Sequence, residues 1–271
     1  MRSEHADCWI PGAHDANVRA AAAMVAAAPS QAAFDAHGEA QEGERPLWVK
    51  SFDVLSVGAL LVLLALAVRQ LAGAAAGGGP WALALAPALV LAVLCADLVS
   101  GLVHWLCDRF FAESTPVLGA MLIKPFREHH RDPLAITRHG FFELCGNNAL
   151  AVIVPVALLR LGEGPQANAR AFFVHAFVIF LALAVFATNQ VHKWAHAKET
   201  VRPVRWLQAY GVILSPHRHA RHHRGDFSNG YCVTTGWLNP ALDALRVLPR
   251  CERALRRAMS RAHDGRSSQP S

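Results

Sequence analysis

Charged side chains are scarce in this chain of 271 residues: Asp, Glu, Lys and Arg make up 17% of it, whereas hydrophobic residues make up 53%. Such a chain is too apolar for a disordered protein and has little charge with which to cover a soluble globule of its size. The composition therefore predicts a membrane protein. The 26 basic and 20 acidic residues give a formal net charge of +6. In a membrane protein we attribute this excess to cytoplasmic loops and anionic lipid headgroups, and not to nucleic-acid binding.

The chain also lacks the motifs of several cofactor classes. Its six cysteines form no C-x-x-C pair, which argues against a disulfide scaffold, a cysteine-rich zinc or iron–sulfur module and an attached haem. It contains no glycine-rich nucleotide fingerprint. Any redox chemistry must therefore come from bound metal or from a separate partner.

Four long apolar stretches predict an all-α fold, a polytopic membrane helical bundle of about four transmembrane helices. They are Phe52–Ala72, Trp81–Leu106, Leu144–Leu161 and Ala171–Thr188. The third stretch is short and contains Pro155, so we expect it to be kinked or packed inside the bundle. Three spans and one buried helix are the alternative.

The distribution of basic residues orients this bundle. Residues 73–80 carry no charge, whereas residues 107–143 and the region after His192 are rich in Arg and Lys. Because basic loops stay on the cytoplasmic side, we expect both chain ends and both basic regions in the cytoplasm. The Ala- and Arg-rich composition is typical of a GC-rich bacterial genome, so we predict a multi-pass protein of the bacterial inner membrane.

These patterns divide the chain into three segments. Residues 1–46 lack an apolar core and predict a disordered N-terminal tail rather than a signal peptide. Residues 47–240 are expected to form the membrane-embedded domain, in which the apolar stretch Trp206–Leu214 lies at the interface. Residues 241–271 predict a basic amphipathic segment on an anionic surface, with a disordered end at residues 267–271. A solvated helical tail is the alternative for the basic segment.

Histidine is unusually frequent: there are 15, and eleven of them lie between His104 and His223. They cluster at the cytoplasmic ends of predicted helices. His104 and Asp108 lie one turn apart at the end of the second span and share one face. His129 and His130 are adjacent, so on a helix they point about 100° apart and would serve different metals, or one would orient the other.

Five further histidines complete the pattern. They are His192 and His196 at the end of the fourth span, and His219, His222 and His223 in the motif H-x-x-H-H. The first two lie one turn apart, and the last three occupy positions i, i+3 and i+4 of one predicted helical edge. Each cluster alone is a weak signal, but the topology brings all of them to one membrane face and predicts a metal centre. His175 lies inside the fourth span, where we expect a packed, hydrogen-bonded histidine.

The number of histidines predicts two metal ions, because a single catalytic zinc needs only about three protein ligands. The candidate catalytic and metal-ligating residues are His104, His129, His130, His192, His196, His219, His222 and His223. Shared between two ions, these side chains leave positions open for water or O2. Two irons are predicted, because iron can change its redox state and activate O2, whereas zinc has no redox chemistry.

Acids and amides near these motifs are expected to orient the ligating rings, since such rings usually donate their second N–H to a carboxylate or carbonyl. The candidates are Asp108, Glu128, Asp132, Glu143, Asn147, Asn189 and His139. Asp108 is alternatively a direct ligand. For Glu128 and Asp132, a salt bridge with Arg127 or Arg131 is an equal alternative.

The sequences around these residues resemble those of a known family. HWLCD, PFREHHRDPLAITRHGFFE, NQVHKWAH, HARHH and TTGWLN, spread from Leu98 to Leu242, resemble the plasmanylethanolamine desaturase family. That family includes the animal enzyme that makes plasmalogens, a bacterial relative linked to light-induced carotenoid synthesis and, more distantly, a plant plastid desaturase of phosphatidylglycerol palmitate. The long PFREHH and TTGWLN motifs favour the plasmalogen branch. His139 also matches this branch.

The resemblance implies an integral-membrane, di-iron, O2-dependent desaturase that forms the vinyl ether of 1-O-alkyl-2-acyl-glycerophosphoethanolamine. The family's histidine motifs fall on the same eight histidines. Because the chain has no flavin or haem motif, electrons would come from a cytochrome b5-like or ferredoxin-like donor on the basic cytoplasmic face. A related di-iron acyl-chain desaturase or hydroxylase and a non-catalytic metal-binding membrane protein are the alternatives.

Overall fold

The computed structural model describes residues 46–77, 80–224 and 226–267, and every regular element within these ranges is a helix. The all-α prediction is therefore confirmed for this part of the chain. The predicted N-terminal tail lies outside the described residues apart from Pro46, and so do residues 268–271 of the predicted disordered end.

Four helices are long and apolar enough to cross a membrane. They are α3 (Leu47–Ala76), α4 (Leu85–Arg109), α7 (Phe141–Leu158) and α8 (Ala169–His196). A short 3-10 turn, η1 (Pro80–Ala84), leads into α4. The prediction of about four spans is thus confirmed, and the third stretch qualifies as a span although Pro155 lies inside α7.

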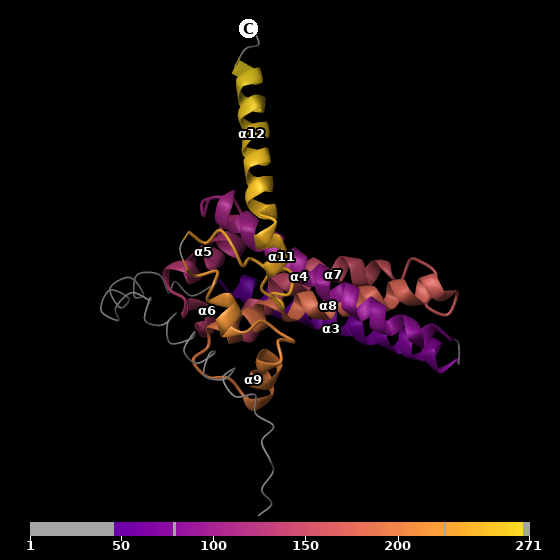
Figure 1. Ribbon diagram of the computed structural model, residues 1–271. Helices are drawn as coiled ribbons and strands as arrows, with labels where there is room; N and C mark the ends of the chain where they lie inside the picture. Colours follow the sequence, from indigo (N-terminus) through magenta and orange to yellow (C-terminus); the bar gives the residue numbers. More distant parts are fainter. Residues whose placement is uncertain (1–45, 78–79, 225, 268–271) are drawn as a thin grey trace, which may run out of the picture.

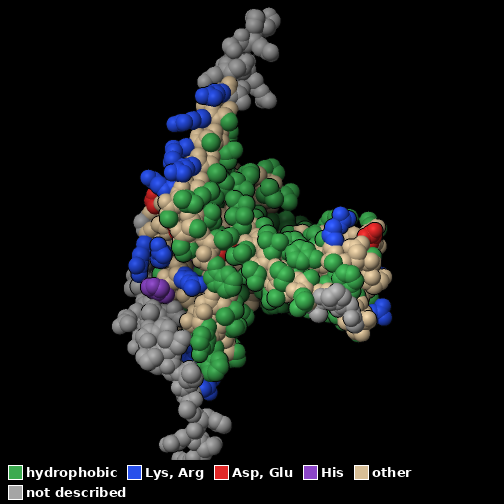
Figure 2. Space-filling view, turned by 45° about the vertical axis from the view of Figure 1, so that its right-hand side comes forward, with side chains coloured by type: hydrophobic (Ala, Val, Ile, Leu, Met, Phe, Trp, Pro, Cys, Tyr) green, Lys and Arg blue, Asp and Glu red, His purple; other side chains and the backbone are tan. Residues whose placement is uncertain are grey.

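The four long helices pack side by side, with α3 on α7, α7 on α8 and α8 on α4 (Figure 1). The core includes Leu60 of α3 and Phe172 and Ile179 of α8, all of which are buried. The outer surface is also apolar: hydrophobic side chains cover most of the visible face of the bundle in Figure 2, and Leu55 and Val62 of α3 are exposed. Lipid would cover such a surface in a membrane.

Small residues allow the helices to approach one another closely. Ala88, Ala92 and Ala96 recur at every fourth position of α4 and are fully buried in the bundle. At Gly146 of α7, an added Cβ would stand 2.3 Å from Oδ1 of Asp53 on α3, so this helix contact requires glycine. Such contacts are typical of membrane bundles, in which close packing replaces the hydrophobic effect.

The shorter elements gather at the end of the bundle where α4 and α8 finish (Figure 1). They are η2 (Gly119–Ile123, a π-helical turn), α5 (Lys124–Arg131), α6 (Ala135–Arg138), α9 (Arg202–Ala209), α10 (Pro216–His219) and α11 (Asn239–Ala244). The last helix, α12 (Val247–Ser267), projects away from this end to one side of the bundle (Figure 1). The predicted interfacial stretch at residues 206–214 corresponds to the end of α9 and the turn after it.

Candidate metal centre

The eight candidate histidines come from four separate parts of the chain and meet at this end of the bundle. α4 contributes His104, α5 contributes two adjacent rings, α8 contributes two rings from its last turns, and α10 with the turn after it contributes three. Helix α8 runs eight residues beyond the predicted end of its apolar stretch, at Thr188, and so carries both its histidines on regular helix. The structure therefore brings together all eight histidines that the sequence predicted as metal ligands.

The helix that carries the H-x-x-H-H motif is shorter than predicted. Ser215 caps α10 by accepting a hydrogen bond from the Arg218 N–H, and Pro216 occupies the first turn, but the helix ends at His219. The N–H of His222 then donates to the His219 carbonyl at 2.9 Å. Residues three apart in such a tight turn eclipse one another, and the rings of His219 and His222 lie only 16° from parallel. The three histidines therefore lie on a short helix and the turn after it, and not on one helical edge as expected. Their rings still converge.

Four rings form a first group of potential ligands. They are His129, His192, His196 and His219, and all are buried. The Nε2 atom of His219 lies 2.9 Å from that of His192 and 2.8 Å from that of His196. The Nε2 atoms of His192 and His196 lie 3.2 Å apart.

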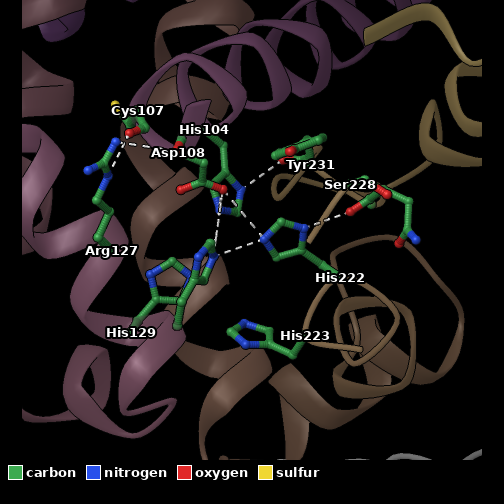
Figure 3. Close-up of polar contacts among 12 residues, drawn as sticks. His104, Cys107, Asp108, Arg127, His129, His222, His223, Ser228 and Tyr231 are labelled. Atoms are coloured by element: carbon green, nitrogen blue, oxygen red, sulfur yellow. Dashed lines mark hydrogen bonds and ion pairs between the residues drawn. The ribbon is translucent and has the colours of Figure 1, made fainter. Parts of the chain in front are cut away.

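A second group adjoins the first and contains a carboxylate. It consists of His104, Asp108, His130 and His222, and Figure 3 shows His104, Asp108 and His222 turned toward one another. His130 Nε2 lies 2.9 Å from His222 Nε2 and 3.4 Å from His104 Nε2. One carboxylate oxygen of Asp108 lies 3.5 to 3.8 Å from these three nitrogens and has no hydrogen-bond partner in the described part of the chain.

His223 lies between the two groups. Its nitrogen is within 4.8 Å of ligand atoms of His129 and His130, and its Nε2 is 3.1 Å from that of His219. The adjacent rings of His129 and His130 belong to different four-residue groups, as expected if they serve different metals.

These distances fit metal binding better than they fit hydrogen bonding. A neutral imidazole offers one N–H and one lone pair, so three mutually adjacent Nε2 atoms, as in His192, His196 and His219, cannot all be satisfied by one another. Nitrogen ligands about 2.1 Å from an ion lie about 3.0 to 3.4 Å apart in octahedral or tetrahedral geometry. A cation in each group would satisfy all the converging lone pairs.

Burial keeps the rings in the protonation state that binds metal. It lowers the pKa of His129, His219 and His223 well below the ordinary value, and that of His222 to about 4. In each case desolvation of the charged ring is the largest cause, because an imidazolium loses its hydration inside the protein. The rings are therefore neutral near pH 7, with lone pairs available to a cation.

Backbone carbonyls orient three of these rings. The Nδ1–H of His104 donates to the Tyr231 carbonyl at 3.1 Å, and that of His222 donates to the Asn229 carbonyl at 2.6 Å. His129 donates from Nδ1 to the Pro125 carbonyl at 3.4 Å. Because a carbonyl only accepts, each of these contacts fixes the proton on Nδ1 and leaves the Nε2 lone pair toward the group.

A buried carboxylate holds the segment that supplies the Tyr231 carbonyl. Asp97 of α4 accepts hydrogen bonds from the backbone N–H groups of Thr235, Gly236 and Leu238, at 2.7, 2.9 and 3.1 Å. The TTGWLN motif is thereby fixed against α4. Asp97 lies within the second predicted span, Trp81–Leu106, and its role was not predicted from the sequence.

The other predicted polar candidates contact the elements around the rings. Asn147 donates to the Met121 carbonyl at 2.8 Å, and Asn189 donates to the Leu144 carbonyl at 2.9 Å. His139 Nδ1 lies 3.0 Å from a Glu143 carboxylate oxygen, and its carbonyl accepts from Lys193. These contacts connect η2, α7, α8 and the loop before α7.

For Glu128 and Asp132, the alternative was a salt bridge with Arg127 or Arg131. In the structure, Asp132 and the two arginines form other contacts. Arg131 pairs with Glu113 and Asp132 pairs with Arg138. Arg127 donates instead to backbone carbonyls at the end of α4, those of Cys107 at 3.1 Å and Asp108 at 3.3 Å. Helix α5, which carries two of the rings, is thereby fixed to α4 (Figure 3).

A cavity of about 270 Å³ opens beside the second group. We call it the His130 cavity, and its lining includes Asp108, Arg109, Arg127, His130, Asp226 and Phe227. The ring of Phe227 stacks on that of His130, with centroids 4.5 Å apart and planes 8° from parallel. Phe227 could not have been identified from the sequence, because it lies in no motif. The cavity gives a small molecule access to the second group.

Several known proteins have sequences similar to this chain. Plasmanylethanolamine desaturase of Myxococcus xanthus is 42% identical over 177 residues, which cover 65% of this chain and 62% of that protein. Plasmanylethanolamine desaturase 1 of Mus musculus is 38% identical over 168 residues, 60% of this chain and 62% of that protein. Chloroplastic fatty acid desaturase 4 of Arabidopsis thaliana is 37% identical over 189 residues, 68% of this chain and 56% of that protein. The chain thus spans less than two thirds of the length of these curated relatives.

No solved structure matches the chain. The family model described as a lipid desaturase domain matches residues 93–263, a range that contains both groups of histidines. This match extends over more than half of the chain and agrees with the resemblance of the histidine motifs. The chain therefore belongs to the lipid desaturase family, which includes the plasmanylethanolamine desaturases.

Proposed function

We propose that the chain is a di-iron, O2-dependent lipid desaturase that introduces the vinyl-ether double bond of plasmalogens into 1-O-alkyl-2-acyl-glycerophosphoethanolamine. The observation that carries this proposal is the convergence of eight imidazole rings into two adjoining groups at one end of an apolar helical bundle. The names of the Myxococcus and Mus relatives support this substrate class.

Each group would hold one iron. His129, His192, His196 and His219 would bind the first, and His104, His130, His222 and the Asp108 carboxylate the second. His223 is close enough to both groups to complete either one. Histidine nitrogen and carboxylate oxygen are ligands that suit iron and leave positions open for O2.

Iron supplies the oxidising power that an unactivated C–H bond requires and that side-chain acids and bases lack. In the net reaction the alkyl chain loses two hydrogens, an external donor supplies two electrons, water supplies two protons, and one O2 becomes two waters. The chain's own residues bind and orient the reactants. The carbonyls of Tyr231 and Asn229 fix the rings of His104 and His222, and the burial of the groups keeps bulk water away.

We assign the remaining candidates to positioning roles. Asn147 and Asn189 would keep η2 and α8 in register with α7, and the pair of His139 and Glu143 would hold the loop before α7. Asn189 lies on α8, which carries two ligating rings, and the other contacts lie on η2, α7 and the loop before α7, of which η2 leads into α5 and α7 packs on α8. Their loss would shift the rings without removing a ligand.

The electron donor would dock on the basic face beside the metal centre. Figure 2 shows Lys and Arg side chains gathered at this end of the molecule and along α12. An acidic donor, cytochrome b5-like or ferredoxin-like, would be attracted to such a face. The basic residues also support a bacterial inner-membrane protein whose metal centre faces the cytoplasm.

An acyl-chain desaturase is a second candidate, because the Arabidopsis relative is named a fatty acid desaturase. It would use the same metal centre and place the double bond in an acyl chain. Lipid mass spectrometry of a host that expresses the chain distinguishes the two, since only a vinyl ether is cleaved by mild acid.

The metal centre is tested by replacing one ring of the second group. His222→Ala is expected to remove bound iron and to lower vinyl-ether formation by at least about 100-fold, because the ring is fully buried among other ligands. Iron per chain is measured in the purified protein, and vinyl-ether lipid in the expressing host.

His217→Ala is the matched control, because His217 lies on the same short helix, α10, two residues before His219, but is exposed. It should keep both iron and activity. Normal turnover in the His222→Ala variant, or a wild-type chain without iron, would contradict the proposal.

A further inference from the structure

A second cavity, of about 240 Å³, lies between the end of α4 and the start of α12. We call it the Trp105 cavity. Four arginines line it: Arg109, Arg246, Arg253 and Arg256. Two acids also line it, and one of them, Glu252, is bound by both Arg109 and Arg256. The lining therefore carries more positive than negative charge.

Two cationic side chains in this lining have no ion-pair partner among the described residues. They are Arg246 and Arg253, and both are exposed. The backbone of Arg246 has a φ of 49°, a left-handed conformation that is unfavourable for arginine. Donors without acceptors, and strain beside them, are typical of an anion site.

The position of the cavity matches the phosphate level of a bilayer. Arg109 is the last residue of α4, a candidate membrane span, and Trp105 lies one turn inside that end. Tryptophan and arginine are enriched where spans leave the membrane. Helix α12, which forms the other wall, projects to one side of the bundle, as a helix lying along the membrane surface would (Figure 1).

The cavity is also close to the metal centre. It shares Arg109 and Asp226 with the His130 cavity. The ring of Tyr231, which lines the Trp105 cavity, lies 5.5 Å from the His104 ring and 5.1 Å from the His222 ring. In an ether phospholipid, only the glycerol backbone and an oxygen on either side separate the first alkyl carbon from phosphorus, a span of about 7 Å at bond lengths of about 1.5 Å.

We propose that the Trp105 cavity binds the phosphate of the substrate's headgroup. Arg246 and Arg253 provide charge-assisted hydrogen bonds to it. This inference rests on the proposed function and deepens it. A phosphate fixed here brings the carbons beside the ether oxygen to the His130 cavity, and keeps the middle of the chain away from it.

The test compares binding of two lipids that differ only in the headgroup. Affinities of the purified full chain in zwitterionic nanodiscs are measured for 1-O-alkyl-2-acyl-glycerophosphoethanolamine and for 1-O-alkyl-2-acyl-glycerol. The wild type is expected to prefer the phospholipid by at least about tenfold, as two or three charge-assisted hydrogen bonds would give. The double variant Arg246→Gln/Arg253→Gln should lose this preference.

Arg257→Gln is the matched control, because it removes the same charge from the same helix but does not line the cavity. It should leave the preference unchanged. Millimolar inorganic phosphate should not displace the lipid, whereas displacement would identify free phosphate as the ligand and overturn the proposal. In turnover assays the double variant should raise KM about tenfold and leave kcat within about twofold. Iron content, which should not change, shows that the centre is intact.

The two proposals fail in different ways. If the double variant keeps the phospholipid preference, or if Arg257→Gln loses as much of it, the phosphate site is wrong even when vinyl ether is formed. If the wild type prefers the phospholipid through these arginines but forms no vinyl ether, the phosphate site stands and the proposed reaction is wrong.

Discussion

At the scale of single residues, Gly101 is what lets the chain orient His104. An added Cβ would stand 2.6 Å from Sγ of Cys232 and 3.3 Å from its backbone nitrogen. Cys232 follows Tyr231, whose carbonyl accepts the His104 N–H. Gly101→Ala should therefore displace this carbonyl and lower iron occupancy of the second group, with a loss of stability of about 1–3 kcal/mol. Iron per chain and thermal unfolding of the purified protein measure both effects.

Gly58→Ala is the control for this substitution, because nothing lies within 4 Å of a Cβ built at Gly58 on α3. It should leave iron content and thermal stability unchanged. Full iron occupancy in the Gly101→Ala variant would show that the second group does not depend on the Tyr231 carbonyl.

The residues around the metal centre show which of its parts can be predicted from the sequence. His192 and His196 were identifiable because helical spacing puts them on one face. Ionisable side chains in a membrane-spanning helix are also rare and usually functional. The roles of the Tyr231 and Asn229 carbonyls could not be identified, because every residue has a backbone carbonyl and its role does not depend on the residue type. Asp97 was visible as a polar residue in a span, but its three backbone partners lie about 140 positions away in the chain.

At the scale of elements, α12 has two opposite edges. Arg250 and Arg257 follow one edge, and Leu255 and Met259 follow the other. Figure 2 shows the basic side chains on the edge turned away from the bundle and apolar side chains on the bundle's side. The predicted basic amphipathic segment thus has the orientation of a helix that would rest on a membrane with its apolar edge down.

This orientation predicts different surroundings for two positions of α12. In a Cys251→Ser background, spin labels are placed at Leu255→Cys and Arg257→Cys in nanodiscs that contain anionic lipid. The label at 255 should be accessible to O2, which concentrates in lipid, and the label at 257 to a water-soluble nickel complex. Equal access of the nickel complex to both positions would favour the solvated helical tail instead.

The boundaries of the elements were less predictable than their existence. Helix α8, which contains the fourth predicted span, continues past Thr188 to His196, because polar residues at a helix end are tolerated where they face other protein. In contrast, α10 stops at His219, where a tight turn replaces the expected helix. Apolar periodicity marks the membrane part of a helix and carries little information about its polar end.

At the scale of the whole molecule, the bundle separates a metal-centre end from a far end at which α7 connects to α8 (Figure 1). Positive-inside orientation predicts that the metal-centre end faces the cytoplasm. Two glycines allow a matched test, since a Cβ at Gly140, beside the metal centre, or at Gly162, in the far loop, meets nothing within 4 Å. In intact cells a membrane-impermeant thiol reagent should label Gly162→Cys and should label Gly140→Cys only after permeabilisation. The reverse pattern would place the histidines outside, where a cytoplasmic electron donor could not reach them.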